Sequence, residues 1–282
     1  MPVRLVDALR ETLSGWHDDL PAAWRAVLED TELDLDGCDP DLMLEHWEPI
    51  FPARKRNAFP GAPEGAHMLR AFDDIGPQDV RCVILGQDPY PEPGFATGRA
   101  FECGNVAAWR ELDKMFSKSV RAFMQLICAA RTGKPEYAHS FDHWPTLLAD
   151  IEAGLVELEA PADIAGCWID SGVLLLNASL TLSRFSVRTD PHQSRGHLPV
   201  WRPLMCGVLR HLARSGRPVV FMTFGDAAAE CLEAAELGRI EPPVFLISRP
   251  HPADAEAILD LENPFLACND FLEAAGERPV DW

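Results

Sequence analysis

Four short apolar runs, each bounded by glycine, proline or polar residues, dominate the hydrophobic pattern of the chain. They cover residues 83–85, 172–177, 218–225 and 244–248. A strand buried on both faces of a parallel sheet has this continuous apolar character, whereas a half-exposed strand alternates. Segments of helical period separate the runs. The pattern therefore predicts an α/β fold in which helices flank a central four-stranded parallel sheet.

Helical periodicity and loop signals divide the remainder of the chain. The pattern predicts helices over residues 1–30, 42–47, 66–72, 109–131, 201–214, 227–235 and 263–275, and a weak helix over 151–168 that Pro161 interrupts. Residues 30–41 and 50–65 are predicted to be irregular. We expect residues 1–75 to form an amino-terminal helical and irregular segment packed on the same domain, and residues 76–282 to form the α/β domain.

Polar residues or glycine follow all four apolar runs. Gln87 and Asp88 follow the first run, Asn177 ends the second, Asp226 follows the third and His251 follows the fourth. Ligands of open parallel sheets bind beyond the carboxyl ends of the strands. We therefore expect these four loops to meet at one rim of the sheet.

Each candidate residue has an ordinary structural explanation when it is taken alone. Asp88 precedes a proline and could form an Asx turn, Asn177 could cap a helix, and His251 between two prolines could be a rigid surface turn. Phe101 could belong to the core. Together with Tyr90, however, they predict a pocket that stacks on and hydrogen-bonds a flat heterocycle.

Composition restricts the possible partners of this pocket. The chain of 282 residues is 47% hydrophobic and carries a formal net charge of -19, from 44 acidic and 25 basic residues. This argues against an extended non-specific grip on a polyanion, which relies on lysine and arginine, but leaves room for a local basic patch.

The eight cysteines are scattered without a CxxC pair, so we expect them to be reduced and structural. We expect no metal site and no cofactor. No apolar run approaches the ~20 residues of a membrane span, and the first residues do not resemble a signal peptide. The sequence predicts a cytoplasmic monomer without a membrane partner.

Several motifs resemble the uracil-DNA glycosylases of the main single-domain family. They are GQDPY at 86–90, GRAF at 98–101, LLLNASLT at 174–181, the His-Pro loop at His251 and the ending RPVDW. The resemblance runs from about residue 80 to the end, with a looser match at 47–74. GQDPY followed by LLLNA is a highly specific combination. It implies a monofunctional DNA glycosylase that hydrolyses the N-glycosidic bond of a flipped-out pyrimidine, most simply uracil, without metal or cofactor.

The resemblance also implies roles for the catalytic residues. Asp88 would position water and stabilise the cationic sugar that develops as the bond stretches. His251 would donate a hydrogen bond to uracil O2 as the base leaves as an anion.

The same resemblance implies four residues that bind the base. Asn177 would read the N3/O4 edge, and the orientation of its amide would decide between uracil and cytosine. Phe101 would stack on the ring, Tyr90 would reject a 5-methyl group by contact with C5, and Gln87 would line the pocket.

The sequence departs from the family around the pocket entrance. Pro91 stands where the family usually has histidine, and Phe95 and Thr97 replace small polar residues. The family's loop after the catalytic histidine carries a leucine that wedges into the duplex, and Ala255 occupies that place. Two acids, Asp226 and Asp254, lie where DNA phosphate would be, and like charges repel.

Three functions fit a matching base pocket with altered duplex-gripping parts. The enzyme could act on single-stranded or loosened DNA, where flipping costs little. It could remove a modified pyrimidine, for example from foreign phage DNA, with Phe95 reshaping the entrance. It could also be an acidic protein that binds a nucleotide or a partner without cleavage. The joint presence of Asp88, Asn177 and His251 argues against the third function.

Overall fold

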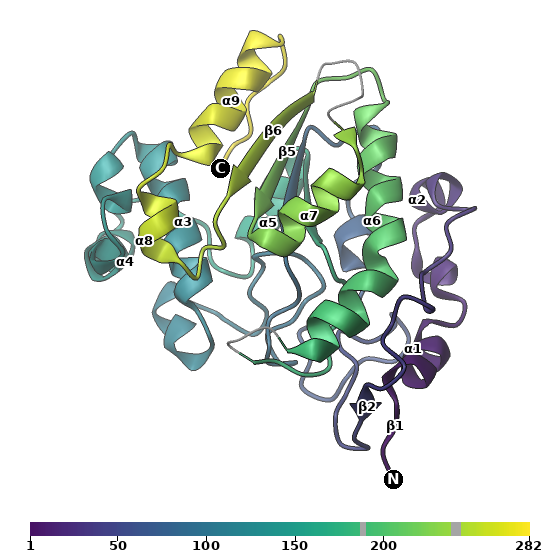
Figure 1. Ribbon diagram of the computed structural model, residues 1–282. Coiled ribbons are helices and arrows are strands. Elements are labelled where there is room, and N and C mark those ends of the chain that lie inside the picture. The colour runs from purple at the N-terminus through teal and green to yellow at the C-terminus, as the bar shows by residue number, and fades with distance from the viewer. Residues whose placement is uncertain (187–189, 238–243) are drawn as a thin grey trace.

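A four-stranded parallel sheet forms the centre of the computed structural model, which describes residues 1–186, 190–237 and 244–282 (Figure 1). The strands are β3 (Cys82–Gly86), β4 (Val173–Asn177), β5 (Val219–Phe224) and β6 (Val244–Arg249), in the order β4-β3-β5-β6. Every residue of β3, β4 and β5 is buried, which explains their continuous apolar runs. The predicted sheet is confirmed.

Helices cover both faces of the sheet (Figure 1). On one face α7 (Asp226–Ala234) contacts β3 and β5 and packs against α6 (Leu198–Ala213). On the other, α9 (Pro264–Ala274) contacts β5 and β6 and packs against α3 (Lys118–Thr132). These helices confirm the predictions at 201–214, 227–235 and 263–275 to within a few residues. Among the described helices, none combines the length and apolar character needed to cross a bilayer.

The remaining α-helices have at most nine residues. They are α1 (Leu5–Leu13), α2 (Ala22–Val27), α4 (Trp144–Glu152), α5 (Ile164–Asp170) and α8 (Ala255–Leu259), with 3-10 helices at Trp16–Asp19, Arg70–Phe72, Trp109–Lys114, Pro135–Ala138 and Phe141–His143, and a π-helical segment at His192–His197.

The amino-terminal segment shares one continuous apolar core with the α/β domain. Leu5 and Leu9 of α1 are fully buried in that core. The indole Nε1 of the buried Trp24 donates a hydrogen bond to the carbonyl oxygen of Ile75 at 2.7 Å. The segment therefore contributes to the stability of the whole chain, and where its boundary lies stays a prediction.

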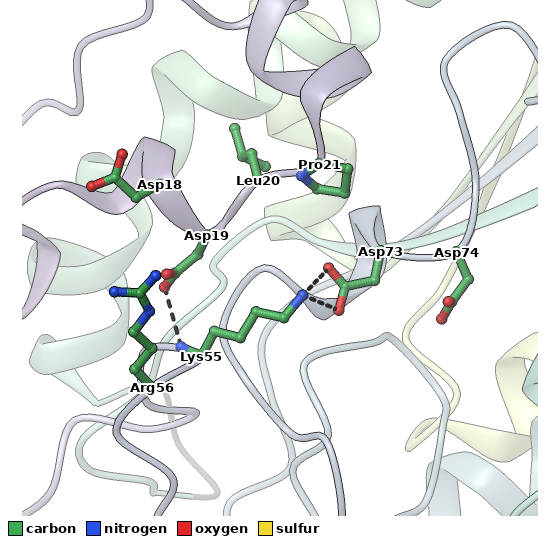
Figure 2. Close-up of a pocket in the computed structure, with 8 residues that line it drawn as sticks. All are labelled: Asp18, Asp19, Leu20, Pro21, Lys55, Arg56, Asp73 and Asp74. Carbon is green, nitrogen blue, oxygen red and sulfur yellow. Dashed lines mark hydrogen bonds and ion pairs between the residues drawn. The ribbon is translucent and has the colours of Figure 1, made fainter.

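Ion pairs join distant parts of this segment to one another around a hollow, which Figure 2 shows. The Lys55 ammonium contacts both carboxylate oxygens of Asp73, at 2.9 and 3.0 Å. The backbone N–H of Lys55 donates to the carboxylate of Asp19 at 3.1 Å, and the Arg54 guanidinium pairs with the same carboxylate. These bonds tie residues 19, 54, 55 and 73 together within the segment, so they stabilise its own conformation.

Two predicted helices are absent or reduced. The prediction at 42–47 is wrong: β2 (Met43–Leu44) pairs there with β1 (Val3–Arg4) in a small antiparallel sheet. The predicted helix at 66–72 is reduced to the 3-10 turn at its end. A helix of six or seven residues gains too few hydrogen bonds to offset the cost of its first turn, so tertiary pairing decides the backbone.

Three longer predicted helices are interrupted. Residues 1–30 form α1 and α2 with a 3-10 turn between them, and residues 153–163 separate α4 from α5 within the predicted 151–168. The predicted helix at 109–131 is broken before α3, because Met115 is extended (φ -140°, ψ 170°). This break brings residues 115–119 to the cavity described next.

Candidate active site

A cavity of about 550 Å³ lies at the carboxyl ends of β3 and β4. All six residues selected from the sequence line it, namely Gln87, Asp88, Tyr90, Phe101, Asn177 and His251. The loops after β3, β4 and β6 thus meet as predicted. Asp226, after β5, begins α7 and is not among the described residues that line the cavity, so the expectation that all four loops line it is wrong for this loop.

Backbone pairing between β3 and β4 continues into the loops that form the cavity. The carbonyl oxygens of Gly86 and Gln87 accept hydrogen bonds from the backbone N–H groups of Ala178 and Ser179, each at 2.9 Å. Gly86 lies directly opposite Asn177 in the register. A Cβ at position 86 would be 2.5 Å from Asn177 Oδ1, so glycine is required for this buried amide to reach the cavity.

The carboxylate of Asp88 receives two amide hydrogen bonds on one oxygen. Gln87 Nε2 donates to Oδ2 at 3.0 Å, and Gln193 Nε2 donates to the same atom. Burial raises the pKa of Asp88 to about 6, and the two amide donors partly oppose that rise. Within the described parts of the chain, no donor is found for Oδ1, which leaves this oxygen available to water or substrate.

Gln193 is a site residue that the sequence reasoning missed. It lies on the π-helical segment directly before α6, 105 residues from Asp88. The only signal was the dense polar run at 191–197 ahead of an apolar helix, which alone does not indicate a pocket. π-Helical turns are rare in proteins overall, and those that occur are often found at functional sites.

A buried chain of hydrogen bonds holds this segment. Trp201 Nε1 donates to Thr181 Oγ1 at 2.7 Å, and the Thr181 hydroxyl lies 2.9 Å from His197 Nδ1. His197 Nε2 lies 2.9 Å from Ser183 Oγ, which lies 3.1 Å from His192 Nδ1. Burial lowers the pKa of His197 to about 3, so its ring is neutral, and one of its nitrogens donates while the other accepts.

His251 is held as a neutral ring with its proton on Nε2. The backbone N–H of Ala253 donates to His251 Nδ1 at 3.1 Å, which makes Nδ1 the acceptor. Burial lowers the pKa of His251. Gly225 adopts φ +94°, and a Cβ there would lie 3.1 Å from His251 Cβ, so glycine permits the close approach of β5 to this loop.

Two aromatic rings complete the wall of the cavity. The ring of Phe101 stacks on Phe123, with centroids 4.1 Å apart and planes 9° apart. Phe101 has φ +59°, an uncommon conformation for a bulky residue that the surrounding packing must hold. Cys103 Sγ donates to the hydroxyl of Tyr90 at 3.6 Å, and burial raises the pKa of Tyr90 well above its ordinary value.

Other residues at the entrance differ from the expectations. The missed lining residues include Arg99, Met115, Phe116, Lys118 and Phe185. Phe95, expected to reshape the entrance, packs against the apolar core and is outside the described lining. Ala255 is fully buried. No cluster of three or more His, Cys, Asp or Glu side chains suited to a metal ion exists in the described ranges.

Similar sequences and similar solved structures point to the same group of proteins. The chain is 31% identical to a uracil-DNA glycosylase of Bordetella pertussis over 271 residues, covering 93% of this chain and 87% of the relative. It is 27% identical to a uracil-DNA glycosylase of Exiguobacterium sibiricum, covering 92% and 97%. The crystal structure of the wild-type UNG of Nitratifractor salsuginis superposes with a TM-score of 0.59 at 22% identity, covering 92% and 93%. No protein-family model matches the chain.

Replacement of Thr181 by valine should destabilise the protein, because Trp201 Nε1 and His197 Nδ1 both lose their buried partner. We expect the free energy of unfolding in urea to fall by about 2 kcal/mol or more. The matched control is Thr132→Val at a half-buried helix end, which removes the bond to the carbonyl oxygen of Cys128 and the long bond accepted from the exposed Lys134 N–H. This variant should cost less than about 1 kcal/mol, because water can replace the lost partners. Equal losses in the two variants would contradict this account of the network.

Replacement of Asp88 by asparagine should stabilise the protein at high pH. The pKa of Asp88 is about 6 in the folded chain against an ordinary 3.8, so the folded state binds this proton more tightly and loses stability as the pH rises from 4 to above 6. The variant should exceed the wild type by about 2–3 kcal/mol at pH 8 and match it near pH 4. Unfolding measured across pH tests this, with the exposed Asp36→Asn as the control.

Proposed function

The chain belongs to the uracil-DNA glycosylase family, and we propose that it hydrolyses the N-glycosidic bond of a deoxyuridine turned out of the base stack, releasing uracil and leaving an abasic site. One observation carries the proposal. The ionisable carboxylate of Asp88, the neutral ring of His251 and the amide of Asn177 line a single cavity at the strand ends. The chemistry needs only side chains and water.

Asp88 acts on the sugar. As the glycosidic bond stretches, positive charge develops on the deoxyribose ring, and a nearby carboxylate lowers the energy of that charge. The amides of Gln87 and Gln193 fix the plane of the carboxylate through Oδ2. Oδ1 then orients the attacking water and accepts its proton. Above pH 6 the carboxylate is ionised, as this step requires.

His251 acts on the departing base. The uracil leaves with the electron pair of the broken bond and carries negative charge on O2. A neutral imidazole with its proton on Nε2 donates a hydrogen bond to that oxygen, while Nδ1 stays engaged with Ala253. A fixed donor of this kind contributes stabilisation that grows as the charge develops.

The remaining wall residues select the base. Asn177 is buried and presents an amide that pairs with the N3 and O4 edge of uracil. Phe101, backed by Phe123, gives the base a flat surface for stacking. Tyr90 and Gln87 line the same cavity, and Tyr90 excludes a 5-methyl group by steric contact.

Single-stranded or loosened DNA suits this protein better than a stable duplex. The net charge of -19 disfavours a long phosphate-gripping surface. A base that is already unpaired also costs less to rotate into the cavity. A modified pyrimidine has no specific support from the described cavity lining, since Phe95 packs against the core and is outside that lining.

Uracil release gives the direct test. Labelled oligonucleotides with one uracil, single-stranded and duplex, are scored by alkali cleavage at abasic sites. We expect cleavage by the wild type, faster on the single strand, and a loss of kcat of about 10²–10⁴-fold in Asp88→Asn and in His251→Ala. Absence of cleavage by folded wild-type protein on every uracil substrate would refute the proposal. Tight binding unaffected by Asp88→Asn would then point to a binding protein.

Gln193 should set the acidic limb of the pH–rate profile. In the wild type, kcat should rise with pH through about 6 as Asp88 ionises. Gln193→Met keeps the side-chain length but removes a donor that lowers the pKa of Asp88, so the limb should move up by about one pH unit. Gln78→Met, at an exposed glutamine remote from the cavity, is the control. A uniform drop in rate with an unmoved limb would assign Gln193 a purely structural role.

A further inference from the structure

Two phenylalanine side chains at the mouth of the cavity are exposed to solvent. Phe116 is 60% exposed and Phe185 is 39% exposed, and both line the cavity. Their ring centroids are 5.8 Å apart and their planes are tilted by 50°. An isolated exposed aromatic is ordinary, but a pair that meets at the entrance of a binding cavity indicates a contact surface for a ligand.

The backbone beneath each ring is anchored although the rings are exposed. The N–H of Phe116 donates to Glu92 Oε1 at 3.3 Å, in the break that precedes α3. Phe185 follows Arg184, whose guanidinium makes two hydrogen bonds of 2.7 Å to the carboxylate of Glu48. Positions fixed in this way lose little conformational freedom when a ligand binds.

The surroundings of the pair favour a nucleobase over a protein partner. Ser117, Lys118 and Ser186 line the same cavity wall as the rings, and the Lys118 ammonium also pairs with Glu256 at 3.3 Å on the exposed surface. The two rings therefore lie within a polar rim that contains one ion-paired cation. Such a combination of aromatic faces and cationic charge is typical of surfaces that bind single-stranded nucleic acid. The patch is also continuous with the cavity, so an occupant of the cavity would place its own neighbours here.

We propose that Phe116 and Phe185 form a stacking platform for the nucleobase adjacent to the flipped-out nucleotide. The inference rests on the proposed function, because it places a nucleotide in the cavity. Every base has a π-face, so the platform binds the neighbour without reading its identity. A neighbour in a single strand can rotate onto the rings, whereas in a duplex it must first leave its own stack.

Binding to defined oligonucleotides tests the platform. The probes are short single strands with one non-hydrolysable 2′-fluoro-deoxyuridine, in which the 5′ or the 3′ neighbour is either a normal nucleotide or an abasic analogue. Fluorescence anisotropy gives Kd for the wild type, Phe116→Ala, Phe185→Ala and the double variant. For either the 5′ or the 3′ neighbour, but not both, removal of the base should raise the wild-type Kd by roughly tenfold.

Loss of the rings should weaken binding as much as loss of the neighbouring base does, and a protein without the rings should no longer respond to removal of that base. Each alanine variant should bind the normal oligonucleotide more weakly, the double variant by about tenfold, and the double variant should no longer distinguish a base from an abasic neighbour. Phe116→Trp should restore binding. Trp47→Ala, at an exposed aromatic elsewhere (67% exposed), should bind as the wild type. The platform would be overturned by a double variant whose affinity still falls tenfold when the neighbouring base is removed. It would also be overturned by a double variant that binds the normal oligonucleotide with the Kd of the wild type.

Uracil release separates this inference from the proposed activity. On cleavable oligonucleotides the double variant should show a raised KM and an unchanged kcat. Wild-type protein that binds the probes with the expected dependence on the neighbour but releases no uracil would support the platform and refute the glycosylase activity. Wild-type protein that binds none of the probes would overturn the platform itself.

Discussion

A buried carboxylate, to which the described residues offer two amide donors and no cationic partner, is the constraint on which this site depends. A charge removed from water must be compensated, and Asp88 is compensated by the amides of Gln87 and Gln193. Amide donors orient the carboxylate without neutralising it, so its field stays directed at the substrate position. An arginine or lysine in the same place would stabilise the chain but would cancel the charge that the cationic sugar requires. Burial raises the pKa of Asp88 and the two amide donors lower it, and the balance of these effects gives a value of about 6.

The position of the Gln193 amide depends on the structure around the cavity. Gln193 reaches Asp88 only because the chain adopts a π-helical turn before α6, and the buried bonds from Trp201 through Thr181 to the two histidines hold that turn. On the opposite side, the β3–β4 register places Gly86 against Asn177 and fixes the base-reading amide. The site is thus preorganised by two independent supports, one of side-chain hydrogen bonds and one of strand pairing.

Prediction from the sequence succeeded where the pattern was strong and local. Continuous apolar runs gave all four strands. For β3, β4 and β5 the reason is burial on both faces, whereas β6 is an edge strand that keeps its apolar run although it is partly exposed. Periodicity failed for short segments, as at 42–47, where pairing between β2 and β1 overrides a weak helical preference. It also failed to locate the break before α3, since Met115 and its neighbours keep helical spacing while the backbone turns to bring Phe116 to the entrance.

The sequence by itself determined the fold class, the family resemblance and six residues that line the cavity. Strand ends converge by the geometry of a parallel sheet, which brings the residues at the ends of β3, β4 and β6 together, and the motif resemblance added Phe101. Only the tertiary structure decided the rest. Gln193 lies on a short π-helical segment and Phe185 in a loop, neither of which has a periodic signal in the sequence. Their positions beside Asp88 and Phe116 depend on how the chain packs over long separations. The tautomer of His251 and the raised pKa of Asp88 likewise depend on a backbone donor and on burial, which a linear pattern does not contain.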